Sequence, residues 1–168
     1  MDFPLTERQK EIIRFYHHNP FIDYIRAQVV PLPDGTVELR LTIEQQHTNL
    51  YNIVHGGVLM TLADTAMGAA ALARNKKVVT MSLSMDFMHA VPLAKTITAT
   101  GICLHDGSHA MTLESEIVDD EGKLYAKAHG TFYVLGKFIE DEEGTRLPKS
   151  ALPGKKFPIG QEEISAEG

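Results

Sequence analysis

The segment that decides the fold covers residues 56–74 and reads GGVLMTLADTAMGAAALAR. It contains six alanines and no proline, and it is apolar on nearly every side. A helix of this composition is buried over most of its surface. Because its side chains are mostly small, the elements around it can approach closely. The sequence therefore predicts one long central helix.

The chain on both sides of this helix has the pattern of β-strands. Apolar runs and strict alternation predict strands over residues 26–30, 36–44, 78–91, 95–105, 109–120 and 123–136. Residues 34–35, 106–108 and 119–122 have the composition of tight turns. Strands joined by such turns are antiparallel neighbours, so an antiparallel sheet of about six strands is expected.

These elements indicate an α+β fold in which a single curved sheet wraps around the central helix. A short N-terminal helix is also predicted over residues 5–18, with Thr6 as N-cap and Gln9 at the capping-box position. We expect residues 1–24 to form this helix and a lead-in, residues 25–136 the main domain, and residues 137–168 a poorly ordered, charged tail containing proline and glycine. One side of the central helix stays open. A second copy placed edge to edge is the simplest closure, which predicts a homodimer. A dimer of dimers is a further expectation, and both dimer and tetramer stay open.

Composition excludes several classes of protein. The 168 residues carry a formal net charge of −6 and no long cluster of lysine and arginine, which argues against nucleic-acid binding. A single cysteine, Cys103, excludes a disulfide framework and is typical of a reducing compartment. No secretory signal is evident, and the most apolar window, residues 58–73, is short for a membrane span and interrupted by Asp64. A soluble cytoplasmic protein that does not bind membranes is expected.

The candidate site lies in residues 49–64, NLYNIVHGGVLMTLAD. A polar loop ends in His55-Gly56-Gly57 and runs directly into the apolar helix. The first turn of a helix has backbone N–H groups without internal partners, and glycine leaves them accessible to a ligand oxygen. This is the arrangement that an oxyanion hole requires. The alternative is that the glycines serve only turn geometry or packing.

Asp64 is an acidic residue in the middle of this apolar helix. Burying a carboxylate there costs several kcal/mol unless it is paired or solvated, so a functional role is a natural hypothesis. Eight residues of helix place it about 12 Å from Gly56 along the axis. If both act in one site, Asp64 must come from a second subunit whose helix runs antiparallel. The alternative is that Asp64 caps a backbone group or contacts water at an interface.

The His55-Gly56-Gly57 motif, the apolar helix carrying Asp64 and the upstream Asn49 together resemble the hotdog-fold thioesterases. Within that fold, the chain is most similar to the acyl-CoA thioesterases of the phenylacetate-pathway and thioesterase-superfamily-member-2 type. The resemblance covers residues 25–136 and includes the strand TMSLSMDFMHAV. It implies a homo-oligomeric hydrolase that cleaves an acyl-CoA into a carboxylic acid and coenzyme A.

The resemblance also implies roles for five catalytic residues. The N–H of Gly56 would bind the thioester oxygen, and His55 would set the loop and contact the carbonyl region. Asn49 would hold the attacking water or the thioester. Asp64 from the other subunit would act as general base or as nucleophile. Thr80 occupies the place of a water-orienting serine or threonine.

Five further residues are candidates for binding the substrate. Gly57 adjoins the oxyanion donor, and Asn52 is the alternative to Asn49. His89 follows a strand and is expected to line the entrance. Lys76 and Lys77 are candidates for contacting the phosphates of coenzyme A at a groove mouth, with a solvated surface position as the alternative.

Other chemistries receive less support from the sequence. There is no G-x-S-x-G motif, and Cys103 has the position of a small core residue. His105 and His109 flank a predicted turn, which favours surface histidines over a metal site. No metal and no cofactor are expected, since coenzyme A is part of the substrate. Two alternatives remain open: an acyl-CoA-sensing module that binds without cleaving, and a hotdog hydratase or dehydratase.

Overall fold

A computed structural model describes residues 3–140. In chain order its elements are α1 (Glu7–Tyr16), α2 (Pro20–Tyr24), β1 (Gln28–Pro31), β2 (Val37–Thr42), the 3-10 turn η1 (Gln45–His47), α3 (Gly56–Ala73), β3 (Lys76–Phe87), β4 (Thr96–Asp106), β5 (Ala110–Asp119) and β6 (Leu124–Lys137). All six predicted strands and the long central helix are present. The predicted tail lies outside the described residues from position 141 onward.

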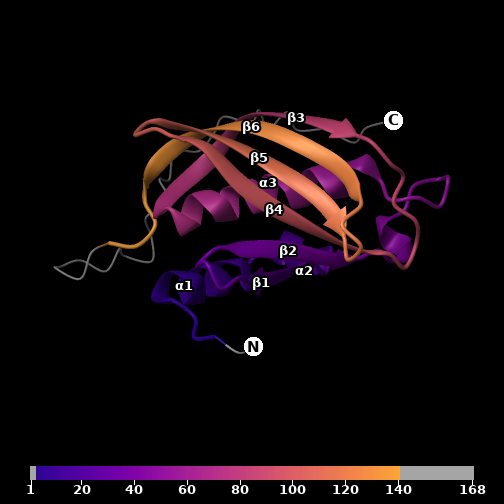
Figure 1. The fold of residues 1–168 in the computed structure, drawn as a ribbon, viewed down its shortest axis with the longest axis horizontal. Helices are drawn as coiled ribbons and strands as arrows, with labels where there is room; N and C mark the ends of the chain where they lie inside the picture. The colour runs from indigo at the N-terminus through magenta and orange to yellow at the C-terminus, as the bar shows by residue number, and fades with distance from the viewer. Residues whose placement is uncertain (1–2, 141–168) are drawn as a thin grey trace, which may run out of the picture.

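The six strands form one antiparallel sheet in the order β1-β2-β4-β5-β6-β3. Strands β4, β5 and β6 follow one another through tight turns, as predicted. Strand β3 does not pair with β4, its next neighbour in the chain, but with β6 at the edge of the sheet. Figure 1 shows the sheet curving over α3, with β1 and β2 continuing it toward α1 and α2. This is the hotdog fold, and it confirms the predicted architecture.

Helix α3 is buried along most of its length, as its composition predicts. By length and hydropathy alone it would also qualify as a membrane span, but the buried residues face the sheet core. One stripe of the helix stays at least partly exposed. It consists of Gly57, Thr61, Asp64, Thr65 and Gly68, which follow one another at intervals of one to four residues. This spacing follows one face of a helix. The stripe is the open side that the single sheet leaves uncovered.

Strand β4 approaches α3 unusually closely at Gly101. A Cβ atom built on Gly101 would lie 2.2 Å from the carbonyl oxygen of Ala66 and 2.9 Å from the Cβ of Ala70. Only glycine therefore allows the helix backbone to rest on the strand at this point. The contact fixes the distance between α3 and the sheet.

The N-terminal helix α1 begins as predicted, with Thr6 and Gln9 forming a capping box. It then packs against α3 by two hydrogen bonds to that helix. Arg8 donates to the carbonyl of Ala73 at 2.9 Å, and the Tyr16 hydroxyl donates to the carbonyl of Thr65 at 3.2 Å. The helix is thus held along the length of α3.

A second short helix, α2, occupies part of the predicted lead-in. Asn19 accepts hydrogen bonds from the N–H groups of Phe21 and Ile22, and Pro20 occupies the first helical position. Proline is tolerated there because that N–H would lack an internal partner anyway. The dipeptide therefore ends one helix and starts the next.

The turn between β5 and β6 is held by a buried carboxylate. Asp119 is 4% exposed and forms an ion pair with Lys95 at 2.8 Å. Its carboxylate also accepts hydrogen bonds from the backbone N–H groups of Glu121 and Lys123 at 3.0 Å and from the Tyr125 hydroxyl at 3.2 Å. The Lys95 ammonium, followed by these N–H donors, holds the pKa of the Asp119 carboxyl well below its usual range, although burial opposes this. In return, the carboxylate raises the pKa of Lys95.

Replacing Asp119 with asparagine should weaken the acid dependence of folding stability. A carboxyl group whose pKa is lowered by folding stabilises the fold above its unfolded pKa of about 4, and this contribution is lost as the pH falls. We therefore expect the wild-type protein to lose more stability than Asp119→Asn between neutral pH and about pH 3. Urea unfolding at a series of pH values measures this. Parallel pH profiles for the two proteins would contradict it.

Candidate active site

The start of α3 offers a backbone N–H without a partner. His55 is the N-cap residue, and its Nδ1 accepts the N–H of Gly57 at 2.9 Å. Within the described residues, no group accepts the N–H of Gly56. The first turn of α3 carries no acidic side chain, so nothing on the helix offsets the positive end of its dipole. These are the features of an oxyanion-binding position.

The His55 side chain caps α3 through Nδ1 and leaves its other ring nitrogen for a different contact. Because Nδ1 accepts a hydrogen bond, the neutral ring carries its proton on Nε2. The side chain is exposed, so this Nε2–H is free to contact a ligand. The predicted dual role of His55 is compatible with this geometry.

A pocket of about 320 Å³ opens beside Gly56. Its wall is mostly apolar and consists of Ile53, Val54, Gly56, Leu59, Phe87, Met88, His89, Ala90 and Val91. The Phe87 ring packs over Gly56, where a Cβ atom would lie 3.3 Å from its Cζ. The free N–H of Gly56 thus lies at the edge of an apolar pocket. A ligand carbonyl could accept this N–H while its apolar substituent fills the pocket.

Asp64 pairs with Thr80 on β3. The Thr80 hydroxyl donates to Oδ1 of Asp64 at 2.7 Å. The Asp64 carboxylate lies on the open stripe of α3 and is half-buried in the single chain, not buried among apolar neighbours as expected from its sequence context. Burial, and after it the Asp64 charge, raise the pKa of the nearby Tyr16 hydroxyl.

A β-bulge explains how Thr80 reaches Asp64. Thr80 lies opposite the buried Phe132, while Ser82 lies opposite Thr131, so Met81 is an extra residue in β3. Without the bulge, Thr80 and Ser82 would share the outer face of the sheet. The extra residue turns Thr80 toward the helix, as bulges near active sites commonly do.

The structure separates the candidate residues of one chain into two groups. His55 and Gly56 lie with the pocket at the start of α3, and Asp64 lies with Thr80 two helical turns further on. Eight residues of continuous helix correspond to about 12 Å. One chain therefore does not bring the carboxylate to the free N–H.

The two candidate asparagines organise the loop before α3. Asn49 accepts the N–H groups of Tyr51 at 2.9 Å and Ile53 at 3.5 Å, which leaves its side-chain NH₂ available. Asn52 has a left-handed backbone with φ of 56°, a conformation that asparagine tolerates well. Both asparagines thus have a local backbone role, and neither lines the pocket beside Gly56.

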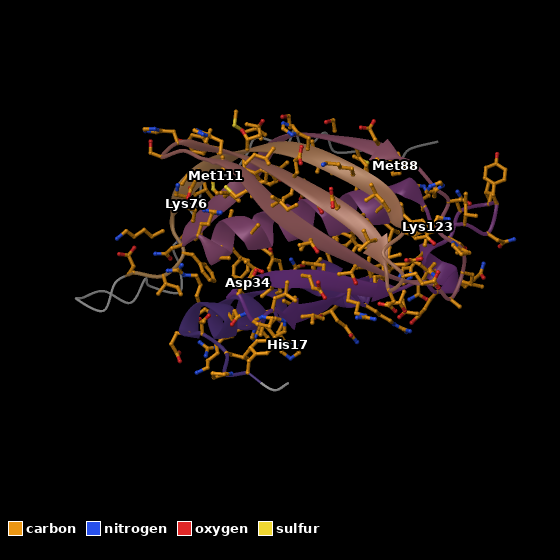
Figure 2. The ribbon with its side chains drawn as sticks, in the orientation of Figure 1. His17, Asp34, Lys76, Met88, Met111 and Lys123 are labelled. Atoms are coloured by element: carbon orange, nitrogen blue, oxygen red, sulfur yellow. The ribbon has the colours of Figure 1, made fainter. Side chains whose placement is uncertain are left out.

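The other candidate binding residues lie at opposite ends of the molecule. His89 lines the pocket beside Gly56, and its ring lies edge-on to Tyr125. Lys76 forms an ion pair with Asp106 and donates to the carbonyl of Gly107 at 2.9 Å. Figure 2 shows Lys76 toward one end of the molecule and Met88 of the pocket toward the other. Lys76 and its neighbour Lys77 therefore do not line the pocket of their own chain.

Several functional candidates were not identified from the sequence. Phe87 lies near the end of a predicted strand, and only its apolar character signals that it lines a pocket. Val91 and Leu59 also line the pocket, but their sequence context is equally compatible with a place in the hydrophobic core. Among residues 3–140, no cluster of three or more histidine, cysteine or acidic side chains could hold a metal ion.

The curved sheet around α3, with a free N–H at the start of that helix and a carboxylate on its open stripe, defines a hotdog-fold thioester hydrolase. Residues 51–126 match the family model of the thioesterase superfamily. A putative esterase of Saccharolobus solfataricus is 32% identical over 115 residues, which is 67% of this chain and 81% of the relative. The chain belongs to the thioesterase superfamily.

Two other relatives carry more specific names. Acyl-coenzyme A thioesterase PaaI of Escherichia coli is 26% identical over 76% of this chain and 91% of its own length. The solved structure of that protein superposes with a TM-score of 0.73, at 24% identity, over 82% of this chain and all of that chain. A hypothetical thioesterase of Streptococcus pneumoniae with coenzyme A gives a TM-score of 0.62 at 28% identity, over 66% of this chain and 90% of that chain. The family resemblance found in the sequence is confirmed.

Proposed function

We propose that this protein is an acyl-CoA thioesterase that hydrolyses an acyl-CoA to the carboxylic acid and coenzyme A. The observation that carries the proposal is the unpartnered N–H of Gly56, placed at the positive end of α3 and at the edge of an apolar pocket. Relatives named acyl-CoA thioesterase, and a structural neighbour with coenzyme A, support this substrate class.

The proposed reaction needs no nucleophilic serine or cysteine. The thioester oxygen accepts the N–H of Gly56, and the acyl group enters the apolar pocket. The Asp64 carboxylate takes a proton from water as the water oxygen attacks the carbonyl carbon. The resulting oxyanion is stabilised by the Gly56 N–H and the helix dipole. The C–S bond then breaks, and the leaving thiolate takes the proton from Asp64.

The site in this proposal combines two chains of a homodimer. Because Asp64 and Gly56 of one helix are too far apart, Asp64 and Thr80 of one subunit act on a carbonyl held by the other. Strand β3 is an edge strand, and the open stripe of α3 adjoins it through the Asp64–Thr80 contact. The Streptococcus pneumoniae thioesterase has been solved as an Asp-to-Ala and as a Thr-to-Ala variant, and the two replaced residues have the spacing of Asp64 and Thr80.

A panel of acyl-CoAs of increasing chain length, with an aryl member, tests the proposal by release of free thiol. Hydrolysis of at least one member, with the carboxylic acid as the second product, is expected. Tight binding without thiol release would favour the sensing module. A change in the acyl chain with the thioester intact would favour the hydratase alternative.

Replacing Thr80 with valine should lower kcat by about ten- to a hundredfold, because a hydrogen bond to a charged group is worth about 1.5–3 kcal/mol. Valine has the shape of threonine but leaves Asp64 without the hydroxyl donor seen at 2.7 Å. Thr80→Ser keeps the donor and should retain most of the activity. Steady-state kinetics on the best acyl-CoA compares the three proteins. Equal activity of the valine and serine variants would remove the hydroxyl from the mechanism.

A further inference from the structure

His47 is a buried histidine beside the candidate site. It lies in η1, eight residues before the N-cap of α3, and it is 2% exposed. Its Nδ1 accepts the N–H of Glu44 at 2.9 Å. Because Nδ1 is an acceptor, the ring is neutral and carries its proton on Nε2.

Retaining this histidine costs stability. Its Nε2 is buried and has no hydrogen-bond partner among the described residues. A buried donor without a partner costs about 1–3 kcal/mol. A leucine would fill a similar space without that cost. The Nδ1 acceptor is the feature of the side chain that an apolar residue would lose.

The hydrogen bonds of His47 lead to the oxyanion position in three steps. Its side chain holds the Glu44 N–H, and its own N–H donates to the Glu44 carbonyl at 3.0 Å. Its carbonyl then accepts the N–H of His55 at 2.8 Å. His55 in turn holds the N–H of Gly57 through Nδ1. Gly56, between these two residues, is left with its N–H free.

We infer that His47 is a positioning residue that fixes the direction of the Gly56 N–H. It does not touch the substrate. It holds the loop that orients His55, and His55 orients the first turn of α3. The inference deepens the proposed function, on which its kinetic part rests. An oxyanion donor acts in the transition state, so its displacement should lower kcat more than it raises KM.

Two amide variants separate this role from simple core filling. Asparagine can place its side-chain oxygen near the position of Nδ1, whereas glutamine reaches toward the position of Nε2. We expect His47→Gln to lower kcat about tenfold with KM within about twofold, and His47→Asn to retain activity within about twofold of wild type. The control is His17→Asn on α1, an exposed position away from the pocket end of the molecule (Figure 2), which should change nothing. Equal losses in both His47 variants, or full activity of the glutamine variant, would overturn the inference.

Nuclear magnetic resonance of the wild-type protein gives a test that does not depend on activity or on variants that fold. We expect the His47 ring to show the Nε2–H tautomer at neutral pH, and the amide hydrogens of Glu44 and His55 to exchange slowly. A charged ring, the Nδ1–H tautomer or rapid exchange of these amides would refute the inference. Absence of thioesterase activity in the wild type, with this signature present, would instead contradict the proposed function alone.

Discussion

Replacing Asp64 with asparagine is expected to lower kcat for acyl-CoA hydrolysis about a thousandfold, the middle of the range for loss of a general base. Asparagine keeps the size of the side chain and an oxygen that can accept the Thr80 hydroxyl, so the contact at 2.7 Å can survive. Its amide does not take a proton from water at neutral pH. The fold should persist, because Asp64 is only half-buried in the chain. Steady-state kinetics and thermal unfolding of both proteins measure the two parts of this prediction.

Asp64→Ala serves as the second variant, because it removes the partner of Thr80 as well as the base. It should be at least as inactive as Asp64→Asn and somewhat less stable. Wild-type rates in both variants would exclude Asp64 from the reaction.

Mixing Asp64→Asn with a variant in which the Gly56 position is blocked tests the two-chain site. Mixed dimers would contain one intact site and recover activity, whereas a site within one chain would not recover.

Composition and turn signals were sufficient to predict most of the fold. Six alanines in one apolar stretch specify a helix with close neighbours, and the Gly101 contact with Ala66 is the closest of these. Residues 106–108 and 119–122 specify antiparallel neighbours, because connections of three or four residues are too short for the crossover that a parallel pair needs. These features are local in the sequence, so the sequence alone predicts them.

The position of β3 could not be predicted in the same way. Its pairing with β6 joins segments far apart in the chain, and no turn between them reveals the register. Strict alternation places Thr80 with Ser82 on the outer face. The bulge at Met81 reverses this for Thr80, and so the Asp64–Thr80 pair appears only in three dimensions.

The local geometry of the candidate site could be predicted from its sequence motif, whereas the surroundings of individual side chains could not. His55 and Gly56 have the expected geometry at the start of α3, because an N-cap and its free N–H groups are set by the local chain. The environment of Lys76 was not predictable, since its partner Asp106 comes from a hairpin tip thirty residues away. His47 carries no sequence signal that distinguishes it from a surface histidine.

Gly101→Ala is the substitution expected to have the largest effect on stability. Its new methyl group would lie 2.2 Å from the Ala66 carbonyl oxygen and 2.7 Å from the carbonyl carbon, and these are backbone atoms of α3. A flexible side chain could move aside, but a helix backbone can only shift as a unit. Overpacking of this kind costs about 3 kcal/mol or more, which corresponds to a fall in Tm of roughly 10 °C.

The matched control for this prediction is Gly35→Ala. Nothing lies within 4 Å of a Cβ atom at Gly35, but its φ of 88° lies in the left-handed region. That variant should lose about 1 kcal/mol from backbone strain alone. Thermal unfolding of the two variants therefore separates collision with α3 from the conformational cost of adding a methyl group. Because α3 carries both Gly56 and Asp64, a shifted helix in Gly101→Ala should also lower kcat, whereas Gly35→Ala should leave kcat unchanged. Equal stability of the two variants would show that the sheet can move away from the helix at Gly101 without cost.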